Sequence, residues 1–249
     1  MPHVAAFRTI SLAAGAAGAL TLLAACSQAS RLDAQCVAGN IPVCTQLGDM
    51  YANGRGVPKD LGRAARAYDR ACTGGAADVC TMLGEIVEQT DAEGGPPRAE
   101  LLFTRACETG SSRGCWRLGL VAAGREQFEK AVALYQKSCD GGWAPGCHQL
   151  AESYEQGEGV PKDVSKALAL YLQACDGESV DGCVSAATLY LGSDPAVARD
   201  LVAATRAYGK ALVLYKESCE SGNQTDCAEQ DKMRTRLAII STGQVPTVR

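Results

Sequence analysis

The sequence predicts an all-α fold, a solenoid of antiparallel helix hairpins cross-linked by six disulfides. Twelve of the thirteen cysteines fall into six pairs, and seven residues separate the two members of every pair. The stretches between successive pairs are copies of one unit, with Leu, Tyr, Gly and Ala at similar offsets. A single short hairpin cannot bury its apolar face alone, so we expect neighbouring copies to stack.

Residues 1–25 predict a lipoprotein signal peptide, and residues 26–35 a short linker behind it. The first 25 residues carry no acidic side chain, and their apolar run is too short and too rich in Ala and Gly for a membrane-spanning helix. The run ends in Leu23-Ala24-Ala25-Cys26, which resembles the lipobox of bacterial lipoprotein precursors. That resemblance implies acylation of Cys26 and export. By resemblance to the sorting rule of two-membrane bacteria, the non-acidic residue Ser27 after this cysteine implies anchoring in the outer membrane, with the protein facing the periplasm. An ordinary secretory signal is the alternative.

The remaining cysteines predict a disulfide framework, because an even number at one fixed spacing is typical of disulfides in an exported protein. Residues eight apart on one helix are separated by about 12 Å. A disulfide needs Cα atoms roughly 4.4 to 6.8 Å apart, so the chain must turn back inside each pair. The predicted pairs are Cys36 with Cys44, Cys72 with Cys80, Cys107 with Cys115, Cys139 with Cys147, Cys175 with Cys183, and Cys219 with Cys227.

Each turn is expected at a glycine two or three residues after the first cysteine, in the left-handed conformation that ends a helix. These glycines are Gly74 and Gly75, Gly110, Gly141 and Gly142, Gly177, and Gly222. A zinc site is the alternative, but zinc ligands have closer spacing, and the part of the chain after the signal holds one histidine, His148. We therefore expect neither a metal nor another cofactor.

The segments 47–72 and 150–175 show the repeated unit most completely. Leu and Tyr share one face of the first helix, Gly ends it, and a Val-Pro-Lys-Asp stretch leads into the second helix. In that second helix Ala lets the paired helices approach, while a Tyr one turn later fills the gap between neighbours. The other copies depart from this unit at 91–97, at Gly124-Arg125 and at 194–208, where either a loop or a longer second helix is expected.

The pattern L-G-x2-Y-x2-G-x-G-V-x2-D-x5-Y-x2-A resembles the Sel-one-like repeat, a relative of the tetratricopeptide repeat. The added C-x7-C resembles the secreted cysteine-rich bacterial members of that family. The resemblance covers Cys36 to Cys227 and implies a right-handed α/α solenoid of about five hairpins with end caps over 36–240. We expect one terminal turn over Arg31 to Cys36, a closing helix over Cys227 to Ile240, and a flexible tail over 241–249.

The resemblance also implies a binding surface along the first helices of the hairpins. It favours a protein or peptide partner in the cell envelope, and membrane contact through the N-terminal lipid. The formal net charge of −4 argues against a nucleic-acid surface, and we expect a monomer. An ordinary solvated helix face is the alternative for each position, and Trp143 could contact a partner or cover a disulfide. The candidate positions are Gln46, Asp49, Arg117, Gln149, Glu152, Ser153 and Thr188.

An enzyme is the second hypothesis, because cysteine-rich members of this family have been assigned penicillin-binding and β-lactamase activity. Peptidoglycan-fragment hydrolysis belongs to the same alternative. Serine β-lactam chemistry uses Ser-x-x-Lys, and no Ser here has Lys three residues later. His148 directly follows Cys147, where a structural role is expected. The sequence therefore names no catalytic residue and favours a binding scaffold; a purely structural envelope protein is the third possibility.

Overall fold

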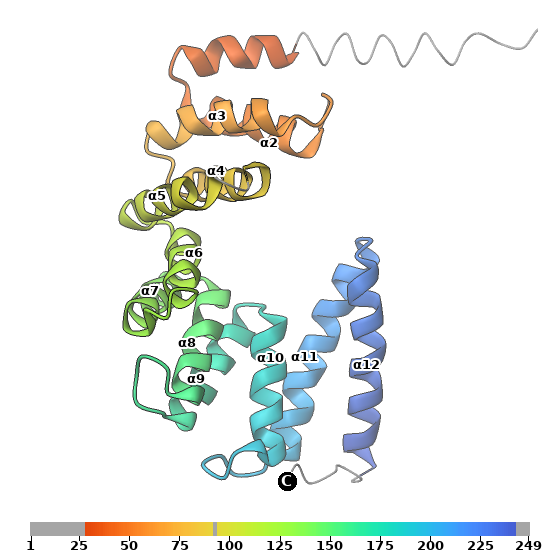
Figure 1. Ribbon diagram of the computed structural model, residues 1–249. Coiled ribbons are helices and arrows are strands. Elements are labelled where there is room, and N and C mark those ends of the chain that lie inside the picture. The colour runs from red at the N-terminus through yellow and green to blue at the C-terminus, as the bar shows by residue number, and fades with distance from the viewer. Residues whose placement is uncertain (1–27, 92–93, 243–249) are drawn as a thin grey trace, which may run out of the picture. The chain divides into compact units, whose positions relative to one another are not determined.

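The computed structural model describes residues 28–91 and 94–242; the predicted signal peptide and Cys26 lie outside this part, as does the tail from 243. Within the described residues the regular secondary structure is helical (Figure 1). After a first helix over 28–37, the helices are α2 (Ile41–Asn53), α3 (Leu61–Thr73), α4 (Ala77–Thr90), α5 (Gly95–Glu108), α6 (Ser112–Ala123), α7 (Phe128–Asp140), α8 (Ala144–Gln156), α9 (Val164–Asp176), α10 (Val180–Thr188) with the π-helical turn η1 (Leu189–Ser193), α11 (Leu201–Glu220) and α12 (Gln224–Ser241).

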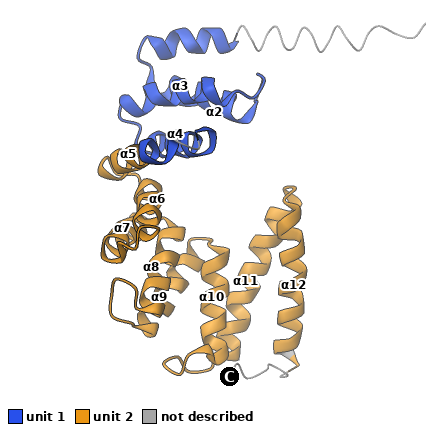
Figure 2. Cartoon of the chain, in the orientation of Figure 1, with its two compact units in different colours: residues 1–99 blue, residues 100–249 orange. Residues whose placement is uncertain are grey.

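The chain forms two compact units, Met1–Ala99 and Glu100–Arg249 (Figure 2). In the first unit α2 packs on α3, and α3 packs on α4. In the second unit each helix from α6 to α11 packs on the helix that follows it, and α8 also touches α6 and α10, the first helices of the neighbouring hairpins. The predicted all-α solenoid of disulfide-linked hairpins is therefore confirmed.

Six disulfides join the end of each hairpin to the start of the next. Their Cα atoms lie 4.4–4.7 Å apart. In the junction of Cys139 and Cys147, the first cysteine lies in the last turn of α7 and the second is the fourth residue of α8. Closing a loop of about eight residues restricts the unfolded chain by about 2.5 kcal/mol in the chain-entropy account. The disulfides therefore stabilise the junctions, where a stack of hairpins otherwise opens locally.

The turn inside each cysteine pair has a left-handed residue three positions after the first cysteine. Five of these residues are glycines with φ between 83° and 106°: Gly39, Gly75, Gly110, Gly142 and Gly222. The prediction is wrong in the fifth pair, where Glu178 takes this conformation (φ 67°) and Gly177 does not. The turn length is the same in every pair, so the position, rather than the residue type, fixes the conformation. Gly177 has a packing role, since a Cβ there would lie 2.8 Å from the Cβ of Ala144.

The glycine in the Leu-Gly step of the first helix makes room for the tyrosine of the second helix. A Cβ at Gly48 would lie 2.3 Å from the ring of Tyr68, and one at Gly119 would lie 2.5 Å from the ring of Tyr135. Tyr68 is 1% exposed and is among the largest fully buried side chains. The pairing of Gly with Tyr thus sets how closely the two helices of a hairpin approach.

The helix ends follow the predicted pattern with two differences. Gly54 and Gly157 end α2 and α8 in the left-handed conformation, as predicted. Asp60 and Asp163 lie before the second helix instead of in its first turn, and each accepts a hydrogen bond from the backbone N–H three residues later (2.9 Å). The N-terminal helix covers 28–37 and is longer than the single turn expected, because its apolar side packs Ala29 and Cys36 into the core.

The fifth hairpin takes up its additional residues in both of the expected ways. The first helix ends in the π-helical turn η1, a loop covers 194–200, and α11 is extended to 20 residues. The closing helix α12 begins at Gln224, three residues before Cys227. Among the described residues, no helix combines the length and the apolar character that a bilayer crossing needs.

Candidate binding wall on the first helices

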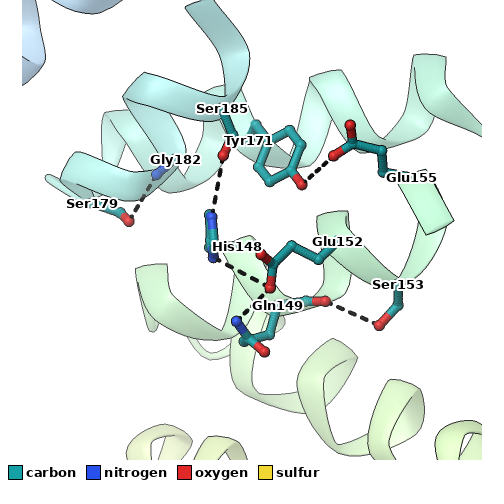
Figure 3. Close-up of polar contacts among 9 residues, drawn as sticks. All are labelled: His148, Gln149, Glu152, Ser153, Glu155, Tyr171, Ser179, Gly182 and Ser185. Atoms are coloured by element: carbon teal, nitrogen blue, oxygen red, sulfur yellow. Dashed lines mark hydrogen bonds and ion pairs between the residues drawn. The ribbon is translucent and has the colours of Figure 1, made fainter. Parts of the chain in front are cut away.

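Polar side chains gather where α8 faces α10 in the second unit (Figure 3). His148, Gln149, Glu152 and Glu155 come from α8, at positions one, two, five and eight after Cys147, and therefore share one helix face. Ser185 of α10 faces them across the hairpin junction. We call these five residues the α8–α10 wall.

His148 lies at the centre of the wall and is only 12% exposed in its side chain. Its Nε2 atom lies 3.4 Å from the Ser185 hydroxyl, and its Nδ1 atom lies 3.8 Å from the Glu152 carboxylate. Its ring also packs on the ring of Tyr171, with centroids 5.3 Å apart. The imidazole thus bridges α8, α9 and α10, which agrees with the structural role expected for it.

Glu152 is the residue of the wall whose carboxyl pKa is shifted. Partial burial raises the pKa of its carboxyl, and the nearby Asp181 and Glu155 charges raise this pKa further. His148 and the hydrogen bond from the Gln149 amide (2.6 Å) act in the opposite direction and lower this pKa. The balance is a pKa above the ordinary glutamate value, because partial burial, with a smaller contribution from the acidic neighbours, outweighs the two groups that lower it.

Core tyrosines connect the packed interior to these first helices through their hydroxyls. In each pair below, a buried ring of a second helix places its hydroxyl next to a polar side chain of the first helix. The pairs are Tyr68 with Asp49 (2.6 Å), Tyr171 with Glu155 (2.6 Å) and Tyr208 with Thr188 (3.2 Å). Burial and the acceptor carboxylate raise the pKa of both Tyr68 and Tyr171, so both hydroxyls stay protonated as donors. Burial and the charge of Glu152 raise the pKa of Tyr135 to about 12.

The structure brings only some of the seven predicted surface residues together. Gln149 and Glu152 belong to the α8–α10 wall, and the nearly buried Ser153 donates to the backbone carbonyl of Gln149 (3.0 Å) on the same helix. Gln46 and Thr188 are exposed, and Asp49 is half-buried. Arg117 packs over the Phe103 ring at 4.9 Å.

The two tryptophans of the chain meet away from the predicted set. The rings of Trp143 and Trp116 lie 6.2 Å apart, and the Arg113 guanidinium lies over the Trp143 ring. Both indole N–H groups are buried without an acceptor among the described residues. Trp143 therefore packs on a second tryptophan, a contact that neither of its expected roles included.

Four residues at this site were not among the predicted surface positions: His148, Glu155, Tyr171 and Ser185. The place of Glu155 could have been found from the sequence, since it lies one helical turn beyond Glu152. The contact between His148 and Ser185 joins residues 37 positions apart. It depends on how α8 and α10 stack, which the repeat pattern does not specify.

A catalytic triad is one possible reading of this wall. Its nucleophile would be Ser185, its base His148 and its orienting acid Glu152. The serine–histidine distance of 3.4 Å and the histidine–glutamate distance of 3.8 Å exceed the hydrogen-bond reach of roughly 2.6–3.2 Å that such catalysis uses. The same carboxylate oxygen of Glu152 already accepts from Gln149.

A family model for the Sel1 repeat matches three segments, residues 42–75, 112–143 and 144–179. These three segments of the chain are similar to Sel1 repeats. The matched segments cover the α2–α3, α6–α7 and α8–α9 hairpins, each with its following turn. Sel1 repeats typically serve as protein-interaction modules.

Known proteins support the same fold. A Sel1 repeat protein from Oxalobacter formigenes is similar at a TM-score of 0.65 and 20% identity, over 80% of this chain and 89% of that one. The immunity protein Pa5087 from Pseudomonas aeruginosa is similar at 0.54 and 16% identity, over 86% and 88%. Cytochrome c oxidase assembly factor 7A from Xenopus laevis is 38% identical over 73 residues, which are 25% of this chain and about a third of that protein's length.

The six disulfides also indicate the compartment in which the chain folds. Disulfides form and persist in oxidising compartments, and cytosolic proteins rarely keep them. The junctions of this repeat array therefore indicate an oxidising, exported environment.

Proposed function

We propose that this chain is an envelope lipoprotein whose Sel1 repeats form a scaffold for a protein or peptide partner, and that the α8–α10 wall receives a basic segment of that partner. The observation that carries this proposal is the geometry of the wall, where the Glu152 and Glu155 carboxyls lie one helical turn apart on a partly open face of α8. Partial burial, and to a smaller degree the nearby acids, raises the pKa of Glu152. A cation from a partner would relieve this repulsion, and a charge-assisted hydrogen bond to a carboxylate is stronger than a neutral one.

The contacts of the wall support a peptide in particular. Glu152 and Glu155 lie one helical turn apart, a spacing that suits successive basic side chains. The Gln149 amide and the Ser185 hydroxyl are groups that can bind backbone carbonyls and N–H groups. The hydrogen bond from Tyr171 and the packing of His148 hold the wall in place before binding, which reduces the entropy lost on association.

A panel of synthetic peptides matched in length tests the proposal, with basic, neutral and acidic members titrated into the purified chain by calorimetry. We expect only the basic peptides to bind saturably, and we expect the double variant Glu152→Gln with Glu155→Gln to weaken this binding at least tenfold. The matched control is Glu108→Gln with Glu129→Gln, two exposed acids on α5 and α7 outside the wall, which should leave affinity within about twofold. Equal affinity for basic peptides in the wall variant and the parent chain would refute the proposal.

Calorimetry in buffers of different ionisation enthalpy adds an independent readout. A bound cation lowers the raised pKa of Glu152. Peptide binding measured at a pH near that pKa therefore releases a fraction of a proton to the buffer. The double variant should release none from this site. A heat of binding that does not change with the buffer would place the peptide elsewhere on the chain.

Attachment to a membrane through Cys26 and a monomeric state are parts of the same proposal. The lipobox-like sequence and the disulfides support export with a lipid anchor. Mass spectrometry of the N-terminal peptide from the host should show an acylated Cys26, and Cys26→Ser should move the chain from the membrane fraction to the soluble fraction. Light scattering in neutral detergent should give the mass of one chain.

The enzyme alternative can be tested at the same wall, because Ser185, His148 and Glu152 are the residues that a catalytic triad would use. Turnover of a chromogenic cephalosporin that disappears in Ser185→Ala would make the wall an active site. Turnover that survives this change would arise from a contaminant.

A further inference from the structure

A cavity of about 370 Å³ in the first unit is lined mainly by charged and polar side chains. The N-terminal helix over 28–37, α2 and α3 line this open cavity, and Figure 1 shows these helices at the start of the chain. Its size lies in the range of small-molecule sites, roughly 300–1,000 Å³. It lies outside the α8–α10 wall, which belongs to the second unit.

Three arginines of α3 line this cavity. Arg63, Arg66 and Arg70 are spaced by three and four residues, so they lie on one face of the helix within two turns. Like charges at this spacing repel each other unless acids or a bound anion compensate them. Guanidinium groups bind phosphate and carboxylate in a bidentate manner, which makes such a group of arginines suited to an oxyanion.

The outer two arginines are held by protein groups. Arg63 contacts the Asp60 carboxylate at 3.4 Å and donates to the Tyr51 hydroxyl at 3.3 Å. Arg70 contacts the Asp33 carboxylate at 3.4 Å. These contacts orient two guanidinium groups at the cavity before a ligand arrives.

Arg66, between them, has no ion pair with any residue of the described part of the chain. It is also a departure from the repeat. The residue six positions before the first cysteine is Arg66 in α3 but apolar and exposed in the other second helices. These residues are Leu101, Ala133, Ala169 and Val213. The repeat fold therefore does not require a cation at this position, and its charge needs another explanation.

We propose that this pocket binds a phosphate-bearing anion, with Arg66 as the main ligand and Arg63 and Arg70 as its flanking donors. The same chemistry is found in free phosphate compounds and in the headgroups of anionic lipids. Ala29, in the pocket wall, is three residues from Cys26, a reach of at most about 11 Å. A lipid at Cys26 would hold the pocket close to the headgroups.

The test is calorimetric titration of the full chain in neutral detergent with two probes: inorganic phosphate, and the same micelles doped with phosphatidylglycerol. We expect saturable phosphate binding that Arg66→Ala weakens at least tenfold. The matched control Arg206→Ala removes an exposed arginine of α11 and should change affinity by less than twofold. Because Arg66 is exposed, the variant should keep the melting temperature of the parent chain, which shows that it folds.

The two probes distinguish the sources. Tighter binding of the phosphatidylglycerol micelles than of inorganic phosphate, with the same dependence on Arg66, identifies a lipid headgroup site. Equal or tighter binding of inorganic phosphate identifies a site for free anions. The proposal is overturned if neither probe binds saturably, or if Arg66→Ala and Arg206→Ala weaken binding equally, which would reflect only the change in net charge.

Discussion

Glu178 is the one residue that departs from glycine at the left-handed position of the six disulfide turns, and its replacement by glycine should stabilise the fifth junction. At φ 67° a side chain with a Cβ costs roughly 1–2 kcal/mol relative to the right-handed region. Glycine avoids this cost but loses about 0.5–1 kcal/mol more conformational entropy on folding. The expected net gain is therefore about 0–1.5 kcal/mol, centred at ~0.75 kcal/mol.

Gly142→Ala is the matched reverse change. Gly142 holds the equivalent position in the fourth turn at φ 83°, and an added Cβ would meet nothing within 4 Å. Its cost is therefore one of backbone conformation alone. Gly142→Ala should destabilise the chain by about the amount that Glu178→Gly stabilises it.

Urea unfolding of the oxidised chains, followed by circular dichroism, measures both variants. Repeat arrays can open locally before they unfold, so amide hydrogen exchange around each turn is the more direct measurement. Protection near residue 178 should rise in Glu178→Gly, and protection near residue 142 should fall in Gly142→Ala. If Glu178→Gly lowers protection while Gly142→Ala behaves as expected, then Glu178 stabilises its turn through its side chain and the conformational argument fails there.

Three further changes follow from the packing and the charges. Gly48→Ala places a Cβ 2.3 Å from the Tyr68 ring, so it should cost about 1–3 kcal/mol, measurable by urea unfolding; no loss would mean that the ring moves freely. Glu152→Gln should change the pH dependence of stability. The folded chain holds the Glu152 proton more tightly than the unfolded chain, so the contribution of this group is greatest at acid pH and is lost as the pH rises through the raised pKa. The variant should then be more stable than the parent chain near neutral pH and equally stable below the ordinary glutamate pKa. Thermal melts over this pH range test this, and melting temperatures that change with pH in parallel for the two chains would contradict it. Replacing both Cys139 and Cys147 by Ala should cost about 2.5 kcal/mol in urea unfolding, and a loss below about 1 kcal/mol would contradict the role of the junction.

The regular part of the fold could be predicted from the sequence because it depends on local chemistry. The cysteine spacing forces a turn, glycines mark the ends of first helices, and the Gly–Tyr pairing sets the approach of two helices in one hairpin. The exception at Glu178 shows the limit of this reasoning. Glycine signals a left-handed residue, but the length of the turn decides which residue takes that conformation.

The candidate site could be predicted less well from the sequence because it depends on contacts between helices, both within a hairpin and between neighbouring hairpins. Glu152 and Gln149 could be named from their places on one helix. The meeting of His148 with Ser185, and the arrival of the Tyr171 hydroxyl at Glu155, depend on the contact of α8 with α9 and α10. Helical periodicity gives the face of each residue but not the residue that it meets on another helix.

Departures from the repeat are the most informative positions in this chain. Where several hairpins carry the same residue type, as with the Gly of Gly48 and Gly119 and the Tyr of Tyr68 and Tyr135, packing explains it. Arg66 and His148 differ: the equivalent residues are apolar for Arg66, while those of His148 are Thr45, Thr81, Trp116, Val184 and Ala228. Since the hairpins of both units fold with those other residues, stability does not require a cation or an imidazole at these places. Each therefore lies where we expect a ligand: an anion beside the N-terminal helix at Arg66, and a basic peptide on the α8–α10 wall around His148.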